Sequence, residues 1–121
     1  MNQNGSQKNS PIDYPSALAR IGDDASFLSE LLELYTLDFE AKCQKLGSAI
    51  EAEDFPAIQE LGHSLKGASA NLSLPFLQRA SYDMETAGRD KDIQKAQESL
   101  SELQKEFTNL KDFIASGAVG S

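Results

Sequence analysis

The sequence predicts an all-α fold, an antiparallel up-and-down four-helix bundle with a short additional N-terminal helix. Apolar residues recur at spacings of three and four along four long segments, which is the pattern of helices that bury one face. No segment shows the strict apolar–polar alternation of a strand. Proline and glycine fall mostly at the ends of the predicted helices, although Gly62 and Gly67 lie inside one of them.

The length of 121 residues suits one domain with a core of its own. We assign residues 1–11 to a disordered leader or linker, residues 12–115 to the bundle and residues 116–121 to a loose C-terminal tail. No run reaches the roughly 18 apolar residues of a membrane span, and the N-terminus lacks an apolar signal segment. We therefore expect no membrane contact. Cys43 is the single cysteine, which suits a reducing compartment and predicts a cytoplasmic protein.

The net charge is −8, and basic residues form no stripe along any predicted helix. Proteins that bind nucleic acid gain most of their affinity from Lys and Arg that neutralise phosphates. The charge pattern therefore argues against a nucleic-acid partner.

The first helix is predicted over Pro15–Ile21, and Gly22 closes it. Asp23 or Asp24 then caps a long helix that runs to about Ala52. Apolar spacing predicts that this long helix buries one stripe of side chains: Leu28, Leu31, Leu32, Tyr35, Phe39, Leu46 and Ile50.

Three further apolar residues of the long helix, Phe27, Leu34 and Leu37, point away from that stripe. We expect them to pack against the short first helix, and a docking patch for a partner is the alternative. They leave dimerisation open, although we expect a monomer.

Asp54 begins the next helix, which runs to about Leu72 and tolerates Pro56 in its first turn. Its apolar stripe contains Ile58, Leu61, Leu65, Ala68 and Leu72. Ser73 is predicted to cap the following helix, which ends at Gly88 after a stripe of Leu77, Ala80, Met84 and Ala87. Asp90 or Asp92 begins the last helix, whose stripe is Ile93, Ala96, Leu100, Leu103, Phe107, Leu110 and Ile114.

His63 is the only histidine of the chain. At about 100° per residue, it lies about 170° from the centre of the apolar stripe on its helix. A histidine that merely fills the core would lie inside that stripe. The sequence therefore predicts that His63 faces water or a partner, where an imidazole can act as nucleophile, base or acid.

The segment around this histidine reads His63-Ser64-Leu65-Lys66-Gly67-Ala68-Ser69-Ala70-Asn71-Leu72. It resembles the signature of histidine-containing phosphotransfer (HPt) domains, the four-helix-bundle carriers of multistep His–Asp phosphorelays. The preceding residues 17–24 and 27–32 look like the first helices of that family, and Leu77, Ala80, Met84-Glu85 and Ala87 match its next helix. The resemblance covers roughly residues 12–115.

The resemblance implies a phosphorelay intermediate in which His63 accepts a phosphoryl group from a receiver-domain aspartate and passes it to another receiver. Lys66 would offset the charge of that group, and Glu85 would bind the second ring nitrogen of His63. Gly67 lies on the face of His63, where a side chain would obstruct a docking partner. Gln59, Ala70 and Arg89 complete the expected docking surface.

The implied partners are receiver domains of response regulators or of a hybrid sensor histidine kinase, and the chain could be a free-standing protein or part of such a kinase. No cofactor is expected, because Mg²⁺ would belong to the receiver. Two positions depart from the family pattern. Gly62 replaces a common alanine, which would loosen the helix beside His63, and Ser73 replaces a common glycine of the turn.

Two other functions compete with this reading. Glu60 and His63 have the Glu-x-x-His spacing of carboxylate-bridged metal bundles, but such a site needs a second histidine and ligands that point inward. A helical interaction scaffold with an inactive histidine is the remaining alternative. An ATP-dependent kinase is not expected, because the chain has no glycine-rich phosphate loop and no room for a nucleotide domain.

Overall fold

The computed structural model describes residues 10–117. Most of the expected leader and the end of the expected tail thus lie outside the described residues. The described part contains five helices and no strand: α2 (Tyr14–Arg20), α3 (Ala25–Glu51), α4 (Phe55–Asn71), α5 (Pro75–Asp90) and α6 (Ile93–Ala115). The all-α prediction is confirmed.

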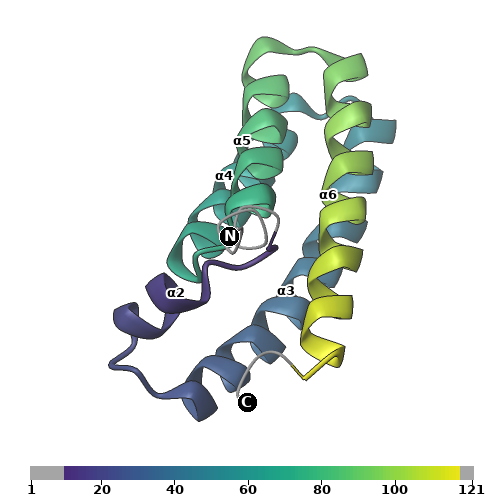
Figure 1. Cartoon of the computed structure of the whole chain (residues 1–121). Coiled ribbons are helices and arrows are strands. Elements are labelled where there is room, and N and C mark those ends of the chain that lie inside the picture. Colours follow the sequence, from purple (N-terminus) through teal and green to yellow (C-terminus); the bar gives the residue numbers. More distant parts are fainter. Residues whose placement is uncertain (1–9, 118–121) are drawn as a thin grey trace, which may run out of the picture.

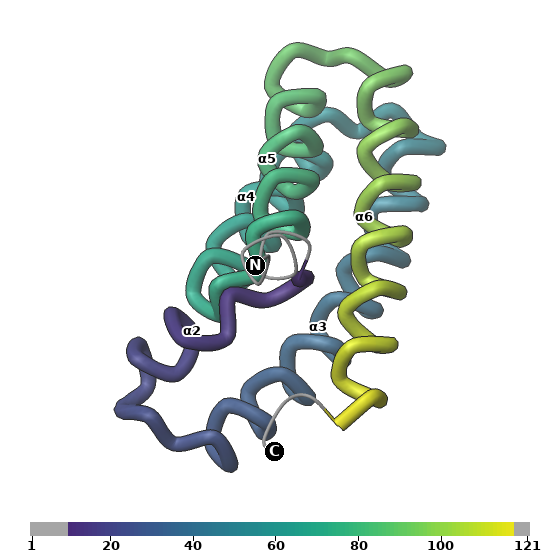
Figure 2. The backbone as a smooth tube through the Cα atoms, in the orientation of Figure 1, coloured from purple at the N-terminus to yellow at the C-terminus, as the bar shows by residue number. Residues whose placement is uncertain are grey.

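Helices α3 to α6 run alternately up and down and form a four-helix bundle (Figures 1 and 2). Each helix contacts the next along the chain, and α3 also contacts α6, so the four helices close a ring around one core. The short α2 lies at the end of the bundle where α4 turns into α5 (Figure 1). Within residues 10–117, no helix is both long enough and apolar enough to cross a membrane.

Aspartate caps fix four of the five helix starts. In each case the carboxylate accepts a hydrogen bond from a backbone N–H three residues further on, which satisfies one of the free donors of the first turn. The sequence left two candidate caps for each of two helices. The structure shows that Asp24 rather than Asp23 caps α3, and that Asp92 rather than Asp90 caps α6. The caps are Asp13, Asp24, Asp54 and Asp92.

Helix α5 differs from the prediction at both ends. Ser73 is not its cap: Leu74 precedes the helix without a side-chain bond, and Ser73 has a positive φ of 57°. The Ser73 hydroxyl instead lies 2.9 Å from that of Ser16, and its carbonyl accepts a 2.8 Å bond from Asp13 N, which attaches α2 to the turn. At the other end Gly88 is inside the helix, and Lys91 ends it in the left-handed conformation.

The core follows the predicted stripes of α3, α5 and α6, and part of the predicted stripe of α4. Leu28 and Leu46 of α3, Met84 of α5 and Leu103 of α6 are fully buried. Phe39 stacks on Phe107 with their ring centroids 4.1 Å apart, which joins α3 to α6. The core therefore lies along the axis of the bundle and fixes the rotation of each helix.

The expectation for Phe27, Leu34 and Leu37 is wrong. These side chains are 44%, 62% and 63% exposed, so packing against α2 does not cover them. The buried residues of this region are instead Ala17, which lies in α2, and Ile12, which precedes the helix. The seven residues of α2 cover only the end of the bundle and leave this face of α3 open.

Candidate functional site

His63 lies on the outer surface of α4, and its side chain is 70% exposed. The buried residues of this helix are Ile58, Gly62, Leu65 and Ser69. At about 100° per residue, His63 lies about 130° from their centre. The outward direction is confirmed, but the core face is turned toward α5 because Gly62 and Ser69 are buried while Leu61 and Ala68 are only partly so.

This rotation reflects a close approach of α4 to α5. A Cβ atom on Gly62 would lie 2.5 Å from Glu85 N and 2.8 Å from Glu85 Cα. Gly62 is therefore a point of backbone contact between the two helices, and the expectation that it loosens α4 is replaced by a packing role. The contact brings Glu85 next to His63.

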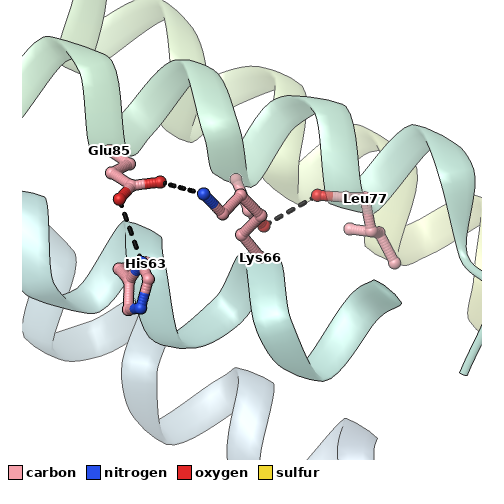
Figure 3. A network of polar contacts seen from close by, with 5 residues as sticks. His63, Lys66, Leu77 and Glu85 are labelled. Carbon is pink, nitrogen blue, oxygen red and sulfur yellow. Dashed lines mark hydrogen bonds and ion pairs between the residues drawn. The ribbon is translucent and has the colours of Figure 1, made fainter. Parts of the chain in front are cut away.

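Glu85 of α5 binds both functional side chains of α4 (Figure 3). His63 Nδ1 lies 3.0 Å from Glu85 Oε2, and Lys66 Nζ lies 2.7 Å from Glu85 Oε1. His63 and Lys66 are one turn apart on α4, so one carboxylate of α5 reaches both. The structure thus brings together the three residues that the sequence analysis placed at the chemical centre.

The electrostatics of the cluster favour an ionised Glu85. The hydrogen bond from Lys66 is the main cause that lowers the pKa of the Glu85 carboxyl, and the bond to His63 adds to it against the opposing effect of burial. An ionised carboxylate can only accept hydrogen bonds, so the bond at Nδ1 of His63 needs the proton on that nitrogen. In the neutral ring Nε2 then carries the free lone pair.

The four residues expected to meet a partner surround this cluster in different ways. Gly67 is exposed, and a Cβ atom there would meet none of the described residues within 4 Å. Gln59 is exposed and Ala70 is partly buried on the same helix. Arg89 is exposed at the end of α5, where its Nε lies 3.2 Å from Asp90 Oδ1.

The sequence analysis missed Tyr82. Its half-exposed ring lies one turn before Glu85 on α5, with Lys66 Nζ 5.5 Å from the ring centroid. This distance is within the range of a cation–π contact, so the ring helps to hold the ammonium of Lys66. The spacing of three residues between Tyr82 and Glu85 was the available signal, since such pairs share a helix face.

It also missed a polar contact between α3 and α4. Lys42 Nζ donates a 2.7 Å bond to the hydroxyl of Ser64, the residue after His63, and forms a 2.8 Å ion pair with Asp38. No local pattern could reveal this contact, because Lys42 and Ser64 lie on different helices.

The structure gives no support to a metal site built on Glu60 and His63 within the described residues. Glu60 lines the groove between α3 and α4, together with Ala49 and Leu61, and among the described residues it forms no hydrogen bond or ion pair with His63. In the part of the chain from 10 to 117, no three His, Cys, Asp or Glu side chains are grouped to hold a metal ion.

The comparisons with known proteins agree with this geometry. The family model of the Hpt domain matches residues 30–113. Among solved structures, the chain is similar to the HPT domain of a sensor hybrid histidine kinase from Shewanella, with a TM-score of 0.70 and 20% identity. That match covers 88% of this chain and 95% of the Shewanella domain. No curated protein matches the chain.

The solved structure supports the fold, and the family model spans most of the bundle, including all of α4 and α5. The chain therefore belongs to the Hpt domain family, the phosphotransfer domains that act as intermediates of phosphorelays.

Proposed function

We propose that His63 is the phosphorylated residue of this domain, and that Nε2 is the atom that takes the phosphoryl group. One observation carries the proposal: a 70% exposed imidazole has its Nδ1 3.0 Å from a carboxylate oxygen. The carboxylate holds the proton on Nδ1 and leaves Nε2 free to reach the active site of a partner.

In the accepting step, the Nε2 lone pair attacks the phosphorus of an aspartyl phosphate on a receiver domain. The P–Nε2 bond forms while the P–O bond to the aspartate breaks, and the aspartate leaves as a carboxylate. The ring keeps its Nδ1 proton, so the phosphorylated imidazole carries a positive charge that Glu85 faces. No proton has to pass between the two proteins. The reverse step delivers the group to a second receiver.

Lys66 has a different part in this proposal. Its ammonium already offsets the charge of Glu85 at 2.7 Å, and its side chain remains 30% exposed. From there it can approach a phosphoryl group on His63 and offset part of its negative charge during transfer. Glu85 and Lys66 thus act on opposite charges of the same intermediate.

The docking surface in this proposal is the outer face of α4 with the adjoining end of α5. Among residues 10–117, no atom lies within 4 Å of a Cβ placed on Gly67, so the fold does not explain the glycine and the approach of a partner does. Gln59 and Ala70 flank the same face, and Arg89 adds a positive charge at its edge.

The partners in this proposal are receiver domains, in separate response regulators or in a hybrid sensor kinase, and the Mg²⁺ of the reaction belongs to them. The proposal also includes a cytoplasmic monomer. The single cysteine is half-buried, and burial raises the pKa of its thiol, which favours the less reactive thiol form.

The test uses receiver domains from the source organism, each first phosphorylated with acetyl phosphate and then mixed with this domain. Transfer to the wild type that is lost in His63→Gln is the expected result. The phosphate on the domain should be labile in acid and stable in base, as a phosphoramidate is. If every receiver fails to transfer, the domain is an interaction scaffold instead. If His63→Gln is phosphorylated equally well, the phosphate is on another residue and the proposed role of His63 is wrong.

A further inference from the structure

Two glycines mark the crossing of α4 and α5. A Cβ on Gly62 would lie 2.5 Å from Glu85 N and 3.0 Å from the carbonyl carbon of Met84. A Cβ on Gly88 would lie 2.7 Å from Gln59 Cα and closer still to Gln59 N. Each contact sets one glycine against the backbone of the opposite helix, and the two contacts lie one turn apart. Any side chain at either position requires the helices to separate.

The first of these contacts falls on the residue that binds His63. Gly62 precedes His63 on α4, and the backbone it touches is that of Glu85 itself. The same carboxylate makes the 3.0 Å contact with His63 Nδ1 and the 2.7 Å contact with Lys66 Nζ. The distance between the Glu85 backbone and α4 therefore decides whether the Glu85 carboxylate reaches the side chains of His63 and Lys66.

We propose that Gly62 is a positioning residue for phosphoryl transfer, which acts by setting the distance between Glu85 and His63. The inference rests on the proposed role of His63. A backbone clash cannot be relieved by turning a side chain, so a methyl group at position 62 pushes α5 outward. A displacement of about 0.5 Å takes a 3.0 Å hydrogen bond to the limit of its range.

The packing also explains why this glycine is tolerated inside a helix. Glycine lowers helix stability relative to alanine, and Gly67 and Gly47 lie in helices where an added Cβ would meet nothing within 4 Å. Gly62 differs from them because it is buried and in contact. Its lack of a side chain is required by the neighbouring helix.

The experiment compares the Gly47→Ala protein with the double variant that carries Gly47→Ala and Gly62→Ala. The first substitution raises helix propensity at the open position 47, which counteracts the loss of packing stability at position 62. Nitrogen NMR of the His63 ring reports which nitrogen carries the proton. Phosphoramidate serves as the donor, since this small molecule phosphorylates histidine without docking. We expect the Nδ1–H form to be lost and the phosphorylation rate to fall about tenfold, as when an imidazole loses its orienting partner.

A double-mutant cycle separates positioning from general damage. In a Glu85→Ala background, Gly62→Ala should change the phosphorylation rate by less than about a factor of two. Leu103→Ala is the control for stability, because it removes core packing from the fully buried face of α6 and leaves α4 against α5. Its His63 ring signals should match those of the wild type.

Two results would overturn the inference: ring signals and rate unchanged by Gly62→Ala, or the same loss of rate with and without Glu85. Failure of the proposed function looks different. In that case the wild type itself is not phosphorylated on His63, while the ring signals still report whether Gly62 sets the contact with Glu85.

Discussion

At the level of single residues, Glu85 is the side chain on which the site depends most. One of its carboxylate oxygens contacts His63 and the other contacts Lys66, so both contacts between α4 and α5 depend on this one residue of α5. The hydrogen bond from Lys66 keeps its pKa low, so it remains a carboxylate over the whole neutral range. In the proposed function, a charged Glu85 both fixes the tautomer of His63 and faces the cation formed on phosphorylation.

The lowered pKa of Glu85 has a measurable effect on stability. The folded state binds a proton at Glu85 less readily than the unfolded state, so the contribution to folding is complete above the ordinary pKa and is lost as the pH falls through the lowered one. We expect the wild type to be more stable than Glu85→Gln near neutral pH, and the gap to close as the pH falls below the ordinary pKa range of a glutamate.

Urea unfolding of both proteins over a pH series measures this gap. Glu98→Gln, at an exposed position of α6, is the matched control for removing one carboxylate from a helix surface. A gap between wild type and Glu85→Gln that stays constant down to about pH 2 would contradict the assigned ion pairs.

At the level of helices, the glycines of α4 have opposite roles. Gly62 is required by contact with α5, whereas the position of Gly67 is open. Gly67→Gln should therefore raise the free energy of unfolding by about 0.5 to 1 kcal/mol, since glutamine favours a helix more than glycine does. The same substitution should slow phosphoryl transfer from a receiver, because the new side chain occupies the docking face.

Gly47→Gln is the control for this prediction, since a Cβ at the partly buried position 47, which lies on α3, also meets none of the described residues within 4 Å. It should gain similar stability and transfer at the rate of the wild type. Phosphoramidate, which needs no docking, should phosphorylate Gly67→Gln normally. Normal transfer from a receiver to Gly67→Gln would show that Gly67 has no part in docking.

The end of α5 gives a second test at this level. Lys91 has a φ of 55°, a conformation that costs about 1 kcal/mol for a residue with a side chain. Lys91→Gly should accordingly raise the free energy of unfolding by up to about 1 kcal/mol. Lys105→Gly, at an exposed position inside α6, should lower it by about the same amount. Thermal unfolding measures both, and equal signs would contradict the assigned helix end.

The two errors at the ends of α5 have a common origin. Gly88 and Ser73 are residue types that stop or cap helices, and local sequence supports either role equally well. Gly88 is in fact needed for its contact with Gln59, and Ser73 for its contacts with α2. Both reasons involve a second helix, so no local pattern could have given them.

At the scale of the whole molecule, the fold follows from the sequence to a large extent. Apolar spacing gave the number, order and buried faces of the helices, and aspartate caps fixed most of their starts. The exposed face of α3 was only the second of two alternatives, since periodicity shows that Leu34 and Leu37 leave the core but does not show what covers them.

The site was predicted to a smaller extent, and by two kinds of argument. Periodicity alone placed His63 on the surface, while the family resemblance pointed to Lys66 and Glu85. The contacts of Tyr82 with Lys66 and of Lys42 with Ser64 depend on how neighbouring helices meet. A pattern within one helix does not describe these distances, and between α4 and α5 the distance depends on Gly62 and Gly88.

The central claim is that Glu85 directs the phosphoryl group to one nitrogen of His63. The most direct test is to phosphorylate the intact domain and to locate the phosphate by phosphorus and nitrogen NMR. The account predicts a single phosphohistidine at His63, bonded through Nε2, with the proton retained on Nδ1. A phosphate on Nδ1, or on any other side chain of the domain, would contradict it.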